Sequence, residues 1–317
     1  MKILVTGGCG YVGSVLVSNL ATKGYEITVV DAQWFGNFLP KSININMIKK
    51  HFSEISLEDL EGIESVIHLA NVANDPSVEL NPVLSWEVNV LHTTQLLNLC
   101  KKVASVKSFM YASSGSVYGV KEEEKVTEEL DLVPISAYNK TKMSAERVCL
   151  SYSDHFKVYC IRPATVCGVS PRMRFDVVVN MFVMHAFRDK KITVLGGDQV
   201  RPNIHIQDMS RVYEHFLENP AIPSGCYNAG FENISVMSIA DTVAKKFSVG
   251  VEVKPSNDPR SYRQDSTKLI STGYTRSKTV ADAIDEIAVA LETGLLMDND
   301  RWYTVKWMTA NKIGDIQ

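Results

Sequence analysis

The chain has 317 residues, of which 45% are hydrophobic and 22% are charged, so it can bury a sizeable core. Its net charge of −3 provides no basic field, which argues against a nucleic acid or an anionic membrane surface as partner. No apolar run approaches the ~20 residues that a membrane-spanning helix needs. The composition therefore indicates an ordinary globular protein.

The six cysteines stand singly, without the spacing of zinc ligands or of a disulfide framework. We therefore expect no metal site and a reducing compartment, the cytoplasm. The first residues lack the long apolar stretch and cleavage site of a signal peptide, in line with that expectation.

Short apolar, β-rich runs alternate with helical patterns along the first half of the chain. Strands separated by helix-length segments indicate βαβ units, and hence an α/β fold with a doubly wound parallel sheet of the Rossmann type. Strands are expected at 2–6, 26–31, 65–70, 108–112 and 158–162, and helices at about 12–23, 85–103 and 137–155.

After Gly168 the chain has more Pro and Gly residues and a less regular pattern, which indicates a second unit. We expect a first domain over 1–167, to which a segment near 203–230 returns, and a smaller α+β lobe over 168–317 that binds the substrate.

A glycine-rich turn joins the first predicted strand to the first predicted helix. The free N–H groups and positive dipole end of that helix favour a bound pyrophosphate. Gly7 allows a tight turn, Gly10 lets the backbone approach the phosphates, and Gly13 allows close packing of helix on strand. Asp31 ends the second predicted strand, where a carboxylate can bind both ribose hydroxyls and repel the 2′-phosphate of NADP. The turn therefore predicts NAD as cofactor.

Tyr138 and Lys142 stand four residues apart in a helical pattern, so both face the same side. A lysine charge lowers the pKa of a nearby phenol, which gives an acid/base for moving a hydroxyl proton while hydride leaves or joins the same carbon. An exposed pair on a surface helix would have the same spacing. The catalytic interpretation is favoured because Ser113 to Ser116 place hydroxyls at the carboxyl edge of the sheet, where ligands of such folds bind.

Together these motifs make the chain resemble the extended short-chain dehydrogenase/reductases of the NAD-dependent nucleotide-sugar epimerase/dehydratase family, including the UDP-glucose 4-epimerases. The resemblance implies that Ser114 hydrogen-bonds the reacting sugar oxygen, Tyr138 is the acid/base, and Lys142 holds the ribose and tunes the tyrosine. It extends over Thr6 to Gly13, Asp31, Val66 to Ala70, Asn89, Ser113 to Gly119, Tyr138 with Lys142, Arg162 to Gly168 and Arg201 to Asp208.

The resemblance also implies binding residues at matching positions. Glu54 and Ile55 follow a presumed third strand, where the family commonly has an Asp that meets the adenine amine. Cofactor contacts are further expected from Gly7, Gly10, Tyr11, Val12, Gly13, Asp31, Leu69, Ala70, Asn89, Tyr138, Lys142 and Pro163. Substrate contacts are expected from Ser114, Ser116, Arg174, Asn180, Arg201 and Arg260, with Arg260 on the diphosphate.

The loop over 170–176 is similar to that of bacterial enzymes acting on sugars, including GDP-linked heptoses, at C4. Arg172 or Arg174 in this loop could contact nucleotide or sugar, or could simply be solvated. The helices near 85–103 and 137–155 match those that form a two-fold bundle in the family, which implies a homodimer.

Three functions fit these features. Family members that dehydrate the sugar have an acidic pair after the hydroxyl residue, where this chain has Gly115 and Ser116, so a 4,6-dehydratase is disfavoured. We expect an epimerase that works through a 4-keto-sugar, with a nucleotide-sugar 4-dehydrogenase or ketoreductase as the alternative. A non-catalytic NAD-binding regulator is the third reading, against which the intact Ser114, Tyr138 and Lys142 argue.

Overall fold

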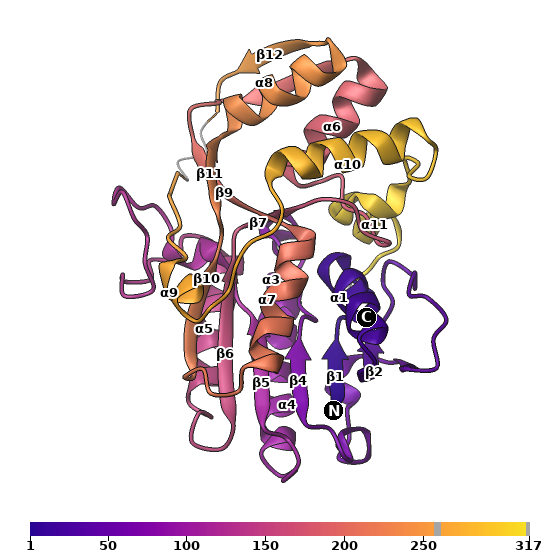
Figure 1. Cartoon of the computed structure of the whole chain (residues 1–317), viewed down its shortest axis with the longest axis vertical. Helices are drawn as coiled ribbons and strands as arrows, with labels where there is room; N and C mark the ends of the chain where they lie inside the picture. Colours follow the sequence, from indigo (N-terminus) through magenta and orange to yellow (C-terminus); the bar gives the residue numbers. More distant parts are fainter. Residues whose placement is uncertain (257–260, 315–317) are drawn as a thin grey trace.

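The computed structural model describes residues 1–256 and 261–314. A seven-stranded sheet runs through its centre, and all neighbouring strands in it are parallel (Figure 1). The expected doubly wound parallel sheet is confirmed. The strand order is β10 (Gly225–Ala229), β6 (Lys157–Pro163), β5 (Ser108–Ala112), β4 (Ser65–His68), β1 (Lys2–Thr6), β2 (Glu26–Asp31) and β3 (Ile45–Lys49).

Helices cover both faces of this sheet because successive strand residues point into different apolar clusters. Ile3 and Val5 belong to the cluster on one face, and Leu4 belongs to the cluster on the other. The helices on the first face are α1 (Tyr11–Thr22) and α7 (Ile206–Glu218), and those on the second are α4 (Thr93–Cys100) and α5 (Ala137–Leu150).

A second layer lies beyond the carboxyl ends of these strands, at the top of Figure 1. Its helices α6 (Val178–Asp189), α8 (Val236–Phe247) and α10 (Val280–Glu292) share one apolar cluster. Its sheets are a three-stranded one, in the order β11 (Glu232–Ser235), β9 (Val200–His205) and β7 (Thr165–Cys167), and the pair β8 (Lys191–Leu195) and β12 (Gly250–Lys254). Between these elements, α7 and β10 return to the central sheet.

The helix expected over 85–103 is interrupted. It consists of α3 (Pro82–Trp86), a π-helical turn η3 (Glu87–His92) and α4. A π-helical turn accommodates an extra residue and is frequent at functional sites. Here it carries Asn89, whose side chain accepts a hydrogen bond from the Val72 nitrogen at 2.8 Å and donates to the Val72 oxygen at 3.0 Å. Asn89 thereby fixes the loop after β4.

The C-terminal segment packs back onto the first sheet. Met308 is buried in the same cluster as Val78, and the Trp307 indole donates to the Trp34 carbonyl at 2.7 Å. The remaining short elements are α2 (Asp75–Leu80), α9 (Thr267–Ser271) and α11 (Thr304–Ala310), with 3-10 turns η1 (Phe52–Glu54), η2 (Glu58–Leu60), η4 (Gly115–Tyr118) and η5 (Asp300–Trp302).

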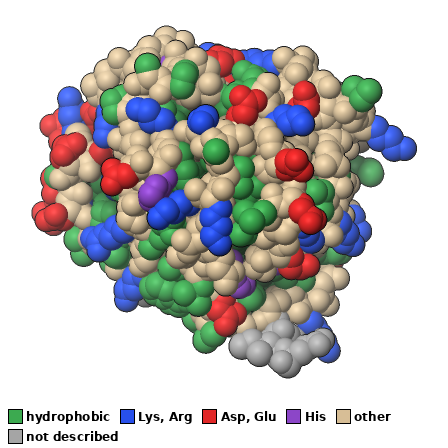
Figure 2. All heavy atoms as spheres, turned by 90° about the horizontal axis from the view of Figure 1, so that it is seen from below, with side chains coloured by type: hydrophobic (Ala, Val, Ile, Leu, Met, Phe, Trp, Pro, Cys, Tyr) green, Lys and Arg blue, Asp and Glu red, His purple; other side chains and the backbone are tan. Residues whose placement is uncertain are grey.

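Within the described ranges, no helix is long and apolar enough to cross a membrane. Figure 2 shows the molecule from below, where basic and acidic side chains are interspersed. This face is at the end of the molecule where the sheet strands begin, opposite their carboxyl ends.

Candidate active site

The glycine turn between β1 and α1 has little room for side chains. Gly7 has a φ of +73°, and a Cβ there would lie 2.5 Å from the Ala70 nitrogen. A Cβ at Gly13 would lie 2.3 Å from the Gly7 oxygen. At Gly10 a Cβ would meet only the Gly7 oxygen, at 3.1 Å, among the described atoms outside its immediate neighbours. The backbone at Gly10 is therefore open to a ligand.

The N-terminus of α1 begins at this turn. In the described part of the chain, no side chain accepts a hydrogen bond from its first N–H groups, and Gly10 is its N-cap. Uncapped N–H groups at a helix N-terminus form a ready site for an anion. The turn therefore fits the diphosphate of a dinucleotide.

Asp31 lies beside the turn, at the end of β2. Its Oδ2 accepts a hydrogen bond from the Cys9 nitrogen at 2.9 Å, and its Oδ1 accepts one from the Gln33 nitrogen at 2.6 Å. Burial raises the pKa of Asp31, and these two hydrogen bonds oppose that rise. The half-buried carboxylate is held at the carboxyl edge of the sheet, as a ribose-binding residue would be.

The other expected cofactor residues differ in their surroundings. Glu54 is exposed, and its Oε1 accepts from the His51 nitrogen at 3.1 Å within a capping box of η1. Ile55 is buried. Tyr11 and Val12 open α1, while Leu69, Ala70 and Pro163 lie at or just beyond the carboxyl ends of β4 and β6. Contact of Glu54 with adenine stays a prediction.

Three side chains after β5 form a hydrogen-bonded chain. Ser116 Oγ donates to Asn139 Oδ1 at 2.7 Å, and Ser114 Oγ lies 2.7 Å from Ser116 Oγ. Either serine hydroxyl can be the donor in the contact between the two. These hydrogen bonds hold Ser114 next to α5, the helix that carries Tyr138.

The Tyr138 hydroxyl lies among polar groups from three segments. Burial raises its pKa, whereas a hydrogen bond with Ser114, the charge of Arg174 and a backbone hydrogen bond at Asn74 lower it. The nearby Asp75 carboxylate raises it further. The positive charge of Arg174 lowers the pKa of Tyr138, and burial outweighs this effect. Tuning of Tyr138 by Lys142 stays a prediction.

Lys142 is 3% exposed and lies on the same helix face as Tyr138. Its Nζ donates to the Ala112 carbonyl at 2.7 Å and lies 5.8 Å from the centre of the Tyr138 ring. Burial lowers the pKa of Lys142 to about 7, because the ammonium has lost most of its hydration. Lys142 is therefore only partly charged at neutral pH.

An NMR titration of the ligand-free protein with labelled lysine side chains should show one lysine with a midpoint at about 7. Because this pKa lies below the ordinary ~10.4, the unfolded chain binds more protons between the two values, and stability should rise with pH across that window. Lys142→Arg should remove the signal, while Lys140→Arg, at an exposed position on the same helix, should leave it unchanged. A Lys142 midpoint above about pH 9 would contradict this account.

A buried ion pair supports the serine segment. Arg162 Nη2 and Nε donate to the two oxygens of Glu146 at 2.6 and 3.0 Å, and Ser113 Oγ donates to Glu146 Oε2 at 2.7 Å. Arg162 Nη1 also donates to the Tyr118 hydroxyl at 2.7 Å. The sequence alone indicates no role for this pair, although Glu146 stands four residues after Lys142 on the same helix face.

Two of the expected substrate residues lie close together, Arg174 in the loop between β7 and α6 and Asn180 in the first turn of α6. Arg174 interacts electrostatically with both Tyr11 and Tyr138, so its guanidinium is close to the glycine turn and to the Tyr138 hydroxyl. The Asn180 amide donates to the Tyr11 hydroxyl at 2.9 Å and to the Arg174 carbonyl at 2.9 Å, and its oxygen accepts from the Gly168 nitrogen at 3.1 Å. Asn180 thus holds the loop together, and its contact with substrate stays a prediction.

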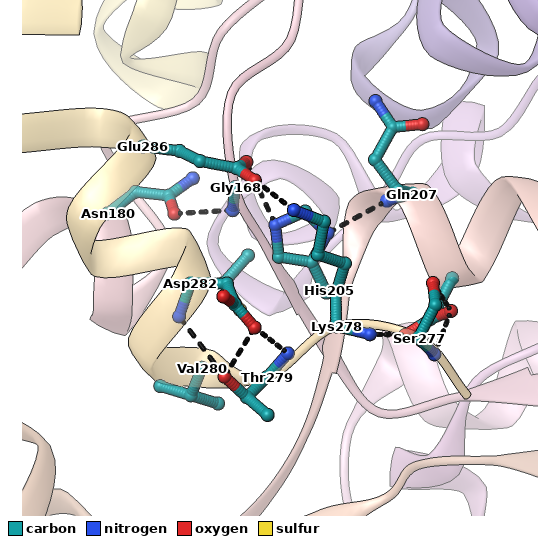
Figure 3. Close-up of polar contacts among 12 residues, drawn as sticks. Gly168, Asn180, His205, Gln207, Ser277, Lys278, Thr279, Val280, Asp282 and Glu286 are labelled. Carbon is teal, nitrogen blue, oxygen red and sulfur yellow. Dashed lines mark hydrogen bonds and ion pairs between the residues drawn. The ribbon is translucent and has the colours of Figure 1, made fainter. Parts of the chain in front are cut away.

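Figure 3 shows Asn180 reaching Gly168 from α6, next to a junction built on His205. His205 Nδ1 accepts from the Gln207 nitrogen at 3.1 Å, so Nε2 carries the proton and donates to Glu286 of α10 at 3.0 Å. Arg201 lies half-buried on β9, upstream of this junction, while Arg260 lies outside the described residues.

Comparison with known proteins identifies the family of the chain. The model of the NAD dependent epimerase/dehydratase family matches residues 3–230. The chain is 26% identical over 308 residues to UDP-glucose 4-epimerase of Lactobacillus helveticus, covering 84% of this chain and 89% of that protein. It is 29% identical over 226 residues to UDP-glucuronic acid decarboxylase 1 of Xenopus tropicalis, covering 66% of this chain but only 51% of that protein.

A solved structure is similar over almost the whole chain. It is UDP-glucuronic acid 4-epimerase from Bacillus cereus in complex with UDP-glucuronic acid and NAD, with 26% identity and a TM-score of 0.81. The likeness covers 92% of this chain and 99% of that one. The glycine turn, Asp31 and the Ser114, Tyr138 and Lys142 group lie within the matched family model. The chain therefore belongs to the NAD-dependent epimerase/dehydratase family, as an enzyme of the short-chain dehydrogenase/reductase type.

Proposed function

We propose that the chain is a nucleotide-sugar epimerase that inverts C4 of the sugar through a 4-keto-sugar intermediate. The observation that carries this proposal is the grouping of Ser114, Tyr138 and Lys142 at the carboxyl edge of the sheet. Bound NAD supplies the hydride acceptor and donor for this chemistry.

The roles of the residues follow from their positions. Tyr138 takes the proton of the C4 hydroxyl as the C4–H bond breaks, and returns a proton to the same oxygen when the ketone is reduced. Ser114, whose hydroxyl lies beside that of Tyr138, hydrogen-bonds the same substrate oxygen and orients it. Arg174 lowers the pKa of Tyr138 and so stabilises the phenolate that accepts this proton, and a charged Lys142, 5.8 Å from the centre of the Tyr138 ring, adds to this effect. Inversion follows when the ketone presents its other face before reduction.

Elimination of water needs an additional acid and base that this site does not offer at the matching positions. Gly115 has no side chain, and the Ser116 hydroxyl is hydrogen-bonded to Asn139. This supports epimerisation or simple oxidation over 4,6-dehydration.

Incubation of the purified enzyme with UDP- and GDP-linked sugars tests the proposal. We expect a product of unchanged mass and altered C4 configuration, without net reduction of the cofactor. A product lighter by two hydrogens, with growing absorbance of reduced nicotinamide, would assign a 4-dehydrogenase instead. If no nucleotide sugar reacts, the result would favour the third possibility, a non-catalytic NAD-binding regulator.

For the substrate we propose a UDP-linked sugar as the first class to test, since the relatives' names specify UDP-sugars. We propose that its diphosphate and sugar are bound by Arg174, Arg201 and Arg260, because one guanidinium group can donate two parallel hydrogen bonds to a phosphate. We also propose that residues 1–167 with 203–230 form the NAD-binding domain and that the other residues of 168–317 form the substrate lobe.

We further propose a cytoplasmic homodimer. Val83 and Leu91, on α3 and η3, are each 57% exposed, and Trp86 lies between them in the sequence. Apolar side chains at the surface of a helix are typical of a subunit interface. Sedimentation of the purified chain should therefore give twice its mass of 35.3 kDa, and a monomer at all concentrations would refute the dimer.

A further inference from the structure

The loop between β7 and α6 is fastened directly onto the glycine turn. Ser170 Oγ donates to the Tyr11 carbonyl at 2.7 Å, and the Tyr11 hydroxyl donates to the Gly168 carbonyl at 2.8 Å. The Arg172 nitrogen donates to Ser14 Oγ, in the first turn of α1, at 3.4 Å. These hydrogen bonds hold the backbone of Arg172 at a fixed position beside the N-terminus of α1.

The side chain of Arg172 is buried, with 3% of the residue exposed. Its guanidinium stacks on the Phe35 ring, with 4.0 Å from the guanidinium carbon to the ring centre. Its Nη2 donates to Thr304 Oγ1 at 3.3 Å, and its Nε is buried without a hydrogen-bond partner in the described chain. A buried cation with unmet donors is unfavourable unless an anion joins it.

The nearby carboxylates already have other partners. Asp31 accepts from two backbone N–H groups, and Asp176 accepts from Arg174 at 2.8 Å and from the Thr304 nitrogen at 3.0 Å. Burial and the charge of Arg174 lower the pKa of Arg172 to about 9, and the two carboxylates only partly oppose this. The cation is thus incompletely compensated by the protein.

We propose that Arg172 binds the diphosphate of the cofactor, donating from its guanidinium while Phe35 supports the opposite face. Its neighbours favour the cofactor over the diphosphate of a nucleotide sugar, because Ser14, Asp31 and Phe35 all belong to α1 or to the end of β2 and its following loop. The inference depends on cofactor binding but not on which sugar reaction follows. A purely structural Arg172, packed between Phe35 and α11, is the competing explanation.

Binding measured by calorimetry on cofactor-free protein separates these explanations. For Arg172→Met we expect the dissociation constants of ADP and NAD to rise roughly 10- to 100-fold, the range for losing a charge-assisted hydrogen bond. Binding of adenosine, which has no phosphate, should change less than about threefold. Arg172→Lys should lose less than Arg172→Met, since it keeps the charge without the planar fork.

Arg188→Met is the matched control. Arg188 is an exposed arginine that contacts Asp298 and Tyr303 in the same C-terminal region but belongs to α6. Arg188→Met should leave the dissociation constants of ADP, NAD and adenosine unchanged. Equal losses for adenosine and ADP, no loss for ADP, or a loss confined to UDP would each overturn the proposal. Should Arg172→Met fail to fold, Arg172→Lys decides by the same comparison of adenosine with ADP.

Discussion

Replacing Tyr138 with Phe should lower kcat about 10²- to 10⁴-fold, the usual contribution of a positioned acid/base. The substitution removes only the hydroxyl, and the Tyr138 ring packs against the apolar cluster on the face of the sheet that α4 and α5 cover. Fold and cofactor binding should therefore be preserved. The measurement is kcat with the best nucleotide sugar found, together with a thermal melt and an NAD titration of the same preparation.

Tyr152→Phe is the control for this substitution. Tyr152 lies just beyond the C-terminus of α5, the helix of Tyr138, and its hydroxyl donates to Asn98 at 2.8 Å. The Tyr152→Phe variant should retain full activity. Unchanged turnover of Tyr138→Phe would show that another group moves the proton.

Replacing Arg162 with Met should destabilise the protein by about 3–5 kcal/mol, because it leaves the buried Glu146 carboxylate without its cation. Although burial opposes it, the hydrogen bonds to Glu146 hold the pKa of Arg162 above its ordinary value, so Arg162 is charged. Activity should fall as well, since Glu146 also holds Ser113, next to Ser114. Urea unfolding measures the first effect and kcat the second.

A double variant tests the cause of this loss. In Glu146→Leu with Arg162→Met the buried charge is gone, so stability should be higher than in Arg162→Met alone. Lys246→Met, which breaks the exposed pair with Asp285, should cost less than about 1 kcal/mol. If Arg162→Met costs no more than Lys246→Met, the pair does not support the serine segment.

The sequence predicted the central fold because buried parallel strands and their intervening helices leave a strong apolar pattern. It also predicted the glycine turn and Asp31, since these depend on residue type at fixed positions along one βα unit. The π-helical turn around Asn89 was missed because a single extra residue hardly changes helical periodicity. The roles of Arg162 and Glu146 were missed because their pairing joins a strand to a helix.

Electrostatics was the least predictable property. Tyr138 and Lys142 share one face of α5, as their spacing predicts. The pKa of each group, however, depends on burial by segments distant in sequence. Arg174 acts electrostatically on Tyr138 from a loop that Asn180 joins to Tyr11 of α1. No periodicity in the chain encodes this placement.

The most direct test of hydride transfer at C4 uses UDP-glucose carrying deuterium at C4, incubated with the enzyme in ordinary water. We predict that the product with inverted C4 retains the deuterium at C4, since the same hydride leaves and returns within one active site. Mass spectrometry and proton NMR of the product measure this. Replacement of the deuterium by hydrogen from water would contradict a 4-keto mechanism with retained hydride.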